Sequence, residues 1–204
     1  MEGFYTLPKI TSGEQVIEKS RFIAIAVPLK SLSEIGIAMH EIRENYPNAR
    51  HYVYAYRLYE GFIEKSSDDG EPQGTGGRPI MELLQHRNVW NVLVVVVRYF
   101  GGVLLGTGGL SRAYAGTARL VIIESEFKKI ALYYVKALCI PYEWFEPLKY
   151  QFDQHNWKTN NEEFTEIVKL LVMVPDQDNE LFEKFMDDFT RKQVPYEDRG
   201  TIWS

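Results

Sequence analysis

The chain has 204 residues, of which 45% are hydrophobic and 25% are charged. A chain of this length and composition buries one large core or two small ones, which excludes extended disorder. The single cysteine, Cys139, excludes a disulfide framework and a paired-cysteine metal site, and it favours a reducing compartment. The longest hydrophobic run, residues 92–97, is too short to span a bilayer, and residues 1–10 lack the features of a signal peptide. We therefore expect a cytoplasmic protein without a membrane segment.

Residues 1–59 predict three elements. Residues 14–30 predict an extended segment that ends at a proline. Residues 31–47 predict an amphipathic helix, with Ser31 and Glu34 as its capping box. Residues 51–59 alternate tyrosines with smaller side chains, which is typical of a strand.

Residues 60–126 continue the alternation of strands and helices. Residues 79–87 predict a short helix with proline in its first turn, and the β-branched run in residues 88–100 predicts a central strand covered on both faces. Residues 110–126 predict a second long helix. The repeated order of strand and helix, with one shared core, indicates an α/β sandwich. The buried side of the last helix is expected to contain Leu110, Ala113, Tyr114, Thr117, Leu120 and Val121.

Pattern and charge both change near residue 130. Residues 1–130 carry 15 basic and 14 acidic side chains, for a net charge of +1, whereas residues 131–204 carry 8 and 14, for −6. We therefore predict two domains, 1–130 and 131–204. The second has the β-α-β-β-α-β order of a ferredoxin-like split β-α-β domain, a small antiparallel sheet with two helices on one face. Its predicted elements are residues 133–140, 144–155, 156–159, 164–174, 179–192 and 195–203.

Two GTGG segments, Gly74–Gly77 and Gly106–Gly109, each stand at a predicted helix start with an arginine close by. Helix starts present unpaired N–H groups, and glycine lets an anion approach the backbone closely, so both segments could cradle a phosphate. The alternative is that the glycines serve tight turns and that Thr75 or Thr107 caps its helix. Residues 72–119 also hold five arginines against one glutamate, for a local charge of +4. The candidate anion-binding or nucleic-acid-binding residues are Gly74, Thr75, Gly76, Gly77, Arg78, Arg98, Gly106, Thr107, Gly108, Gly109 and Arg112.

Nucleotide-binding patterns do not match either segment. Thr107 stands where a P-loop requires lysine, and Pro79 and Ser111 stand where a dinucleotide-binding pattern requires its last glycine. We therefore expect no nucleotide and no other cofactor.

Three acids, Asp68, Asp69 and Glu71, precede the first GTGG segment. They could bind a divalent cation, but their spacing does not fit a calcium loop. We favour the alternative that they are solvated, or pair with arginines and shape the loop. The four histidines have no metal-ligand spacing, so no metal is expected; His51 and His86 are weak acid–base candidates. No catalytic constellation is visible, and an enzyme is the less favoured class.

Aromatic residues lie close to the predicted site in sequence. They could form a stacking platform for RNA bases, or they could pack against a helix with the hydroxyl groups in water. The residues are Tyr52, Tyr54, Tyr56, Tyr99 and Phe100.

Four segments carry a resemblance to a known family: EKSRFIA (18–24), ARHYVYAY (49–56), DDGEPQGTGGRPI (68–80) and VVVVRYFGGVLLGTGGLSRAYAGTAR (94–119). Together they resemble the YigZ/IMPACT family of the bacterial two-domain type. The resemblance implies a first domain similar to the second domain of ribosomal protein S5 and a second domain similar to the fifth domain of elongation factor G. Two departures from the family pattern occur: Gly76 replaces a usual alanine, and Tyr52 and Val53 replace a polar or cysteine pair.

The resemblance implies a role in translation control. In eukaryotic relatives, binding of a partner that activates an initiation-factor kinase uses an extra N-terminal domain, so that activity is not carried over. We expect a non-enzymatic, RNA- or ribosome-associated factor that holds RNA phosphate at both GTGG segments. Neutralising about four phosphates would give a log–log salt slope of roughly −3.

Two alternatives stay open. One is a hydrolase-type enzyme acting on a phosphorylated or peptide substrate, with Asp68, Asp69, Glu71 and His51 lining its cleft. The other is a protein-docking module whose contact surface consists of tyrosine and arginine, and whose partner is a protein.

Overall fold

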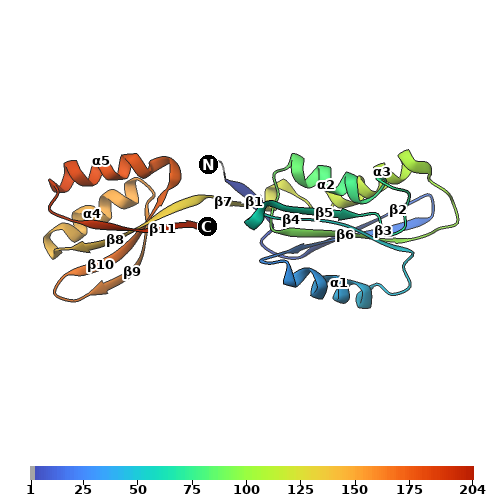
Figure 1. Ribbon diagram of the computed structural model, residues 1–204, viewed down its shortest axis with the longest axis horizontal. Helices are drawn as coiled ribbons and strands as arrows, with labels where there is room; N and C mark the ends of the chain where they lie inside the picture. The colour runs from blue at the N-terminus through green and yellow to red at the C-terminus, as the bar shows by residue number, and fades with distance from the viewer. Residues whose placement is uncertain (1–2) are drawn as a thin grey trace. The chain divides into compact units, whose positions relative to one another are not determined.

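A five-stranded antiparallel sheet organises the first part of the chain, in the order β2-β3-β6-β4-β5. The computed structural model describes residues 3–204, which contain two compact units, Phe4–Lys129 and Ile130–Ser204 (Figure 1). The central strand is buried from Val92 to Arg98, as its β-branched run predicts. The strands are β2 (Thr11–Ile17), β3 (Ser20–Pro28), β4 (His51–Leu58), β5 (Ile63–Ser67) and β6 (Val92–Tyr99).

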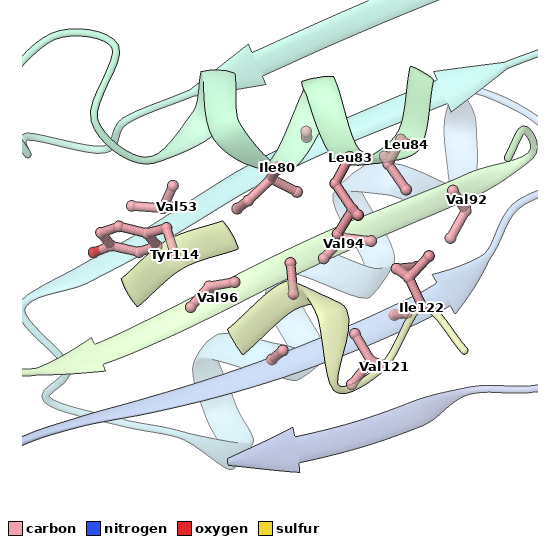
Figure 2. Packing of buried hydrophobic residues seen from close by; sticks show 14 of the residues in the cluster. Val53, Ile80, Leu83, Leu84, Val92, Val94, Val96, Tyr114, Val121 and Ile122 are labelled. Carbon is pink, nitrogen blue, oxygen red and sulfur yellow. The ribbon is translucent and has the colours of Figure 1, made fainter. Parts of the chain in front are cut away.

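Helices cover both faces of this sheet (Figure 1). Helix α1 (Ser33–Asn45) lies on one face, and α2 (Gly77–His86) and α3 (Gly106–Arg119) lie on the other. The buried core between the sheet and helices α2 and α3 holds both helices against this face. Figure 2 shows this core, with labelled side chains Val53, Ile80, Leu83, Leu84, Val92, Val94, Val96, Tyr114, Val121 and Ile122.

Three local predictions for this unit were wrong. The segment 14–30 forms two strands rather than one, because Glu18 and Lys19 turn the chain with φ angles of 46° and 64°. Helix α1 has no capping box: Ser31 Oγ lies 2.8 Å from Ser33 Oγ, and the Glu34 carboxylate accepts the N–H of Lys30 instead. Helix α3 begins at Gly106 rather than Leu110, and Leu120 follows its end with 42% of its surface exposed.

The strand tyrosines pack beneath α1. Tyr52 and Tyr56 are 7% and 8% exposed in the core on the α1 side of the sheet. The Tyr52 hydroxyl donates to the carbonyl of Tyr46 at 2.7 Å. The rings of these two residues thus pack against a helix as the second interpretation expected, and they cannot form a stacking platform, but the Tyr52 hydroxyl bonds to the protein rather than to water. Phe100 is 45% exposed.

The second unit has a four-stranded antiparallel sheet in the order β11-β8-β10-β9, with both helices packed on one face (Figure 1). This is the ferredoxin-like arrangement, and it confirms the predicted fold class of an α/β first domain followed by a split β-α-β domain. The core of this unit contains aromatic and aliphatic side chains from both helices and from every strand except the edge strand β9. The elements are β8 (Leu132–Ile140), α4 (Tyr142–Gln154), β9 (Lys158–Phe164), β10 (Val168–Pro175), α5 (Asn179–Thr190) and β11 (Tyr196–Trp203).

Two short strands, β1 (Phe4–Thr6) and β7 (Lys128–Ile130), pair with each other. In residues 3–204, no helix has both the length and the hydrophobicity to cross a membrane.

Candidate functional site

The first glycine segment folds around the carboxylate of Asp68. Its Oδ2 atom accepts the N–H of Gly74 at 2.7 Å, and its Oδ1 atom accepts those of Gly76 and Gly77 at 2.9 and 2.8 Å. These three amides are the donors that the sequence prediction assigned to an external anion. The prediction that the first glycine segment binds an external anion was therefore wrong, because the Asp68 carboxylate already accepts from these three amides.

Asp68 is stabilised as an anion in this position. Burial raises the pKa of its carboxyl group, whereas the three backbone hydrogen bonds from Gly74, Gly77 and Gly76 lower it. The combined effect of the hydrogen bonds is larger, so the pKa lies below its ordinary value. Thr75 does not cap α2, because its hydroxyl donates to the carbonyl of Pro72 at 2.6 Å. Asp68 takes over that role at the start of α2.

The five arginines of residues 72–119 do not form one patch. Arg78 is exposed and pairs with Glu82 at 2.7 Å, and Arg98 is buried and pairs with Glu71 at 2.6 Å. Arg87 binds the carbonyl of Ile122 and pairs with Glu124. Arg112 and Arg119 are exposed, but Arg119 is in the last turn of α3, about 20 Å along the helix from its start.

The second glycine segment forms the first turn of α3. Gly106 has a φ of 67°, and no side chain among residues 3–204 caps this helix. Its first N–H groups therefore carry the partial positive charge of a helix N-terminus without an internal anion. A Cβ atom added at Gly108 would lie 3.5 Å from Nη1 of Arg112, so this guanidinium lies beside the same turn.

A pocket of about 380 Å³ opens at this helix start, and we call it the α3 pocket. Three of the residues predicted to bind an anion line this pocket: Gly106, Thr107 and Arg98. The loop acid Glu71 lines it as well. Hydrophobic side chains supply much of the remaining wall. The full lining is Arg50, His51, Glu71, Pro72, Arg98, Phe100, Leu104, Leu105, Gly106, Thr107 and Leu110.

A buried ion pair forms the floor of the α3 pocket. The Glu71 and Arg98 side chains are 4% and 6% exposed, and Glu71 Oε1 accepts from Arg98 Nη1 at 2.6 Å and from the Tyr114 hydroxyl at 2.8 Å. Burial, reinforced by the Glu71 carboxylate, raises the pKa of Tyr114 far above its ordinary value, so its hydroxyl stays protonated and donates. The two charges cancel, so the pocket does not present Arg98 as a free cation.

Asp69 positions His51 at the edge of this floor. The Asp69 carboxylate accepts the N–H of Tyr52 at 2.6 Å, and its carbonyl lies 2.7 Å from His51 Nδ1. His51 Nε2 lies 3.7 Å from Glu71 Oε1. The expected pairing with arginine holds for Glu71, which pairs with Arg98, and for Asp69, whose Oδ1 lies 3.8 Å from Arg43 Nη2. It is wrong for Asp68, which shapes the loop through backbone amides.

Sequence reasoning missed part of this site. Arg50 and Leu104 were not candidates, His51 was a candidate only as an acid–base group, and Phe100 was a candidate for base stacking. A usable signal was present in the ARHYVYAY segment, because His51 is the first residue of β4 and pairs with Arg98 of β6, and the Arg50 N–H donates to the Arg98 carbonyl at 2.9 Å. Conversely, eight of the predicted anion-binding residues do not line the pocket: Gly74, Thr75, Gly76, Gly77, Arg78, Gly108, Gly109 and Arg112.

Comparison with known families now adds to this geometry. The Impact N-terminal domain matches residues 18–122, which include both glycine segments and the whole α3 pocket. A second match, to a domain of unknown function (DUF1949), covers residues 138–193. The chain belongs to the IMPACT family.

IMPACT relatives cover most of this chain. IMPACT family member YvyE from Bacillus subtilis is 30% identical over 196 residues, which cover 93% of this chain and 88% of the relative. IMPACT family member YigZ from Escherichia coli is 31% identical over 180 residues, covering 86% and 87%. The match to Protein IMPACT from Rattus norvegicus is 34% identical and covers 59% of this chain but 39% of that protein.

A solved structure has the same fold. The crystal structure of a hypothetical protein is 28% identical to this chain, covers 96% of it, and superposes with a TM-score of 0.58. The sequence comparisons thus establish the IMPACT family for this chain, and the solved structure supports its fold.

Proposed function

We propose that this IMPACT-family chain is a non-enzymatic, RNA- or ribosome-associated factor in translation regulation, and that its α3 pocket holds a phosphate of single-stranded RNA. One observation carries the proposal. The uncapped start of α3 lies in the same pocket as the exposed Arg50 and the half-exposed ring of Phe100. Helix starts and guanidinium groups bind phosphate, and exposed aromatic rings stack on bases.

The geometry lowers the number of phosphates expected. Arg98 and Arg78 are paired with carboxylates, which leaves Arg50 and Arg112 as the exposed cations near the start of α3. Two neutralised phosphates predict a log–log salt slope of about −1.4 for a single strand, half the value expected from the sequence. The first glycine loop has no role in this binding, since Asp68 occupies its amides.

Fluorescence anisotropy with a labelled single-stranded RNA tests the proposal. Binding should weaken between about 50 and 200 mM salt with the slope given above. Arg50→Ala and Arg112→Ala should each weaken binding and reduce the magnitude of the slope by about 0.7. Arg119→Ala is the matched control, because Arg119 is equally exposed but lies at the far end of α3. A slope near zero, or equal effects of Arg112→Ala and Arg119→Ala, would refute RNA binding at this pocket.

A hydrolase-type enzyme is the second candidate. It is favoured by one contact: Asp69 holds His51 Nδ1, so the other ring nitrogen is available as a general base near the pocket. Turnover of a generic phosphoester or peptide that His51→Ala abolishes would support this candidate.

A protein-docking module is favoured by Leu104, which is 88% exposed at the rim of the α3 pocket. Crosslinking in cells, with an Arg50/Arg112 double alanine variant as control, separates it from RNA binding. A crosslinked partner that is a single protein, insensitive to nuclease, would select the docking module.

A further inference from the structure

His51 Nε2 and the Glu71 carboxylate lie next to each other at the floor of the α3 pocket. The Asp69 carbonyl can only accept, so the contact of 2.7 Å places the proton of His51 on Nδ1. In the neutral form of this ring, Nε2 carries a lone pair that can accept a hydrogen bond, and this atom lies 3.7 Å from Glu71 Oε1. That separation is too long for a hydrogen bond.

Glu71 has capacity that the protein does not use. Its Oε1 atom accepts from Arg98 and Tyr114, whereas Oε2 has no hydrogen-bond donor among the described residues. The side chain is only 4% exposed, yet it lines the pocket. Oε2 is not among the buried side-chain atoms that lack a partner, so it is open to the pocket. A ligand hydroxyl at this point can donate to a charged acceptor, which contributes more than a hydrogen bond between neutral groups.

The chemistry of the missing group can be specified. A phosphate cannot supply it, because an ionised phosphate has acceptors only and is repelled by the carboxylate. The ligand must carry a hydrogen-bond donor at the floor as well as an anion at the start of α3. A ribonucleotide unites a phosphate, a sugar hydroxyl and an aromatic base in one unit, and carboxylates are well suited to accept from a ribose 2′-hydroxyl. A pocket of about 380 Å³ suits one such unit rather than a longer stretch of RNA.

We infer that Glu71 and His51 recognise a ribose 2′-hydroxyl and make the α3 pocket selective for RNA over DNA. The inference rests on the proposed function, because it assigns the sugar of the RNA whose phosphate binds at the start of α3. The hydroxyl donates to Glu71 Oε2 or to His51 Nε2. The base lies toward Phe100, on the other side of Arg98, whose guanidinium carbon is 5.5 Å from the centre of that ring.

Three oligonucleotides of one sequence test the inference on the full chain: RNA, DNA and 2′-O-methyl RNA. Methylation keeps an RNA-like sugar but removes the donor, so it separates hydroxyl recognition from sugar shape. RNA should bind about tenfold tighter than either analogue, as expected for a hydrogen bond to a charged group. His51→Phe and Glu71→Gln should each reduce the ratio of RNA affinity to DNA affinity to about twofold. Glu71→Gln also removes the charge that neutralises Arg98, so all three oligonucleotides should bind this variant more tightly.

Loss of the preference must not come from unfolding. Circular dichroism and thermal melting identify a variant that does not fold, and His51→Phe is the milder change because the Glu71–Arg98 pair stays intact. If all three oligonucleotides bind equally with the expected salt slope, the 2′-hydroxyl inference is wrong and the proposed phosphate site stands. If RNA stays preferred in folded His51→Phe and Glu71→Gln, recognition lies elsewhere and the inference is also wrong. If none binds, both proposals fail.

Discussion

The carboxylate of Asp68 accepts the backbone N–H of Gly77 at 2.8 Å, at the first residue of α2. The capping group of α2 thus comes from nine positions earlier in the chain. Together with the bonds to Gly74 and Gly76, it gives the loop an internal anion where the sequence suggested an external one. The stability of the loop should therefore depend on the charge of this one side chain.

Asp68→Asn should destabilise the first unit by about 1 to 3 kcal/mol at pH 7, because three donors lose a charged acceptor. The pKa of Asp68 in the folded protein lies below its ordinary value of 3.8. Its stabilisation is therefore complete above about pH 4 and is lost as the pH falls through the folded-state pKa. Urea titrations followed by the NMR signals of β6 should show the gap between wild type and variant narrowing below pH 4.

Glu41→Gln provides the control for that experiment, since Glu41 is an exposed carboxylate on α1 of the same unit. It should change stability by less than about 0.5 kcal/mol at every pH. A gap for Asp68→Asn that stayed constant down to pH 2 would show that the carboxylate charge is not the stabilising feature.

Gly76 is one departure from the family pattern and Val53 belongs to the other, and these two residues lie against each other. A Cβ atom added at Gly76 would lie 2.7 Å from Val53 Cγ1 and 3.2 Å from Cγ2, and Val53 is fully buried. Gly76→Ala alone should therefore cost about 1 to 3 kcal/mol through overpacking. In Val53→Ala the space is free, so the double variant should be more stable than the two single effects predict, by about 1 kcal/mol. Strict additivity in urea unfolding would contradict the contact.

Arg98→Met should be strongly destabilising, by about 3 to 5 kcal/mol. The substitution leaves the Glu71 carboxylate, which is 4% exposed, without its cation. Arg78→Ala is the control. Arg78 Nε lies 2.7 Å from Glu82 Oε1, but both side chains are exposed, so the free energy of unfolding should fall by less than about 0.5 kcal/mol. Equal melting temperatures for the two variants would argue against the importance of the buried pair.

Lys136→Met should have the opposite outcome in the second unit. Lys136 is fully buried, but its partners Asp198 and Glu183 are 60% and 47% exposed. Removing the lysine leaves both carboxylates in water, and methionine fits the surrounding aromatic side chains without a charge to desolvate. The free energy of unfolding, followed by the NMR signals of β8, should stay within about 1 kcal/mol of wild type or increase. A loss above about 3 kcal/mol would mean that the ion pairs outweigh the desolvation of the lysine.

The architecture could be predicted because it depends on hydrophobic patterns that extend over whole helices and strands. The run in β6 is buried throughout, and the order of elements after residue 130 matches a ferredoxin-like sheet. Local details escaped where a residue departs from its usual conformational preference. Glu18 and Lys19 form a turn with positive φ although neither is glycine or asparagine, and β5 is a short polar edge strand that its sequence does not distinguish from a loop.

The candidate site could be predicted only in part. Glycine-rich composition correctly located amides at helix starts, but it could not reveal which amides are already bonded. Asp68 is adjacent to the first segment in sequence, and its carboxylate reaches three of those amides only because of the particular path of the loop. The burial of Arg98 and its pairing with Glu71 depend on contacts between residues 27 positions apart, which local pattern does not encode.

The pairing of β1 with β7 places the entry and exit of the first unit side by side. A domain whose two ends lie close together can be inserted into another polypeptide without a change in its own structure. The rat relative, in which the aligned portion makes up 39% of the protein, is consistent with such portability. The same geometry favours circular permutation: joining the two ends with a short linker and opening the chain elsewhere should yield a protein that still folds.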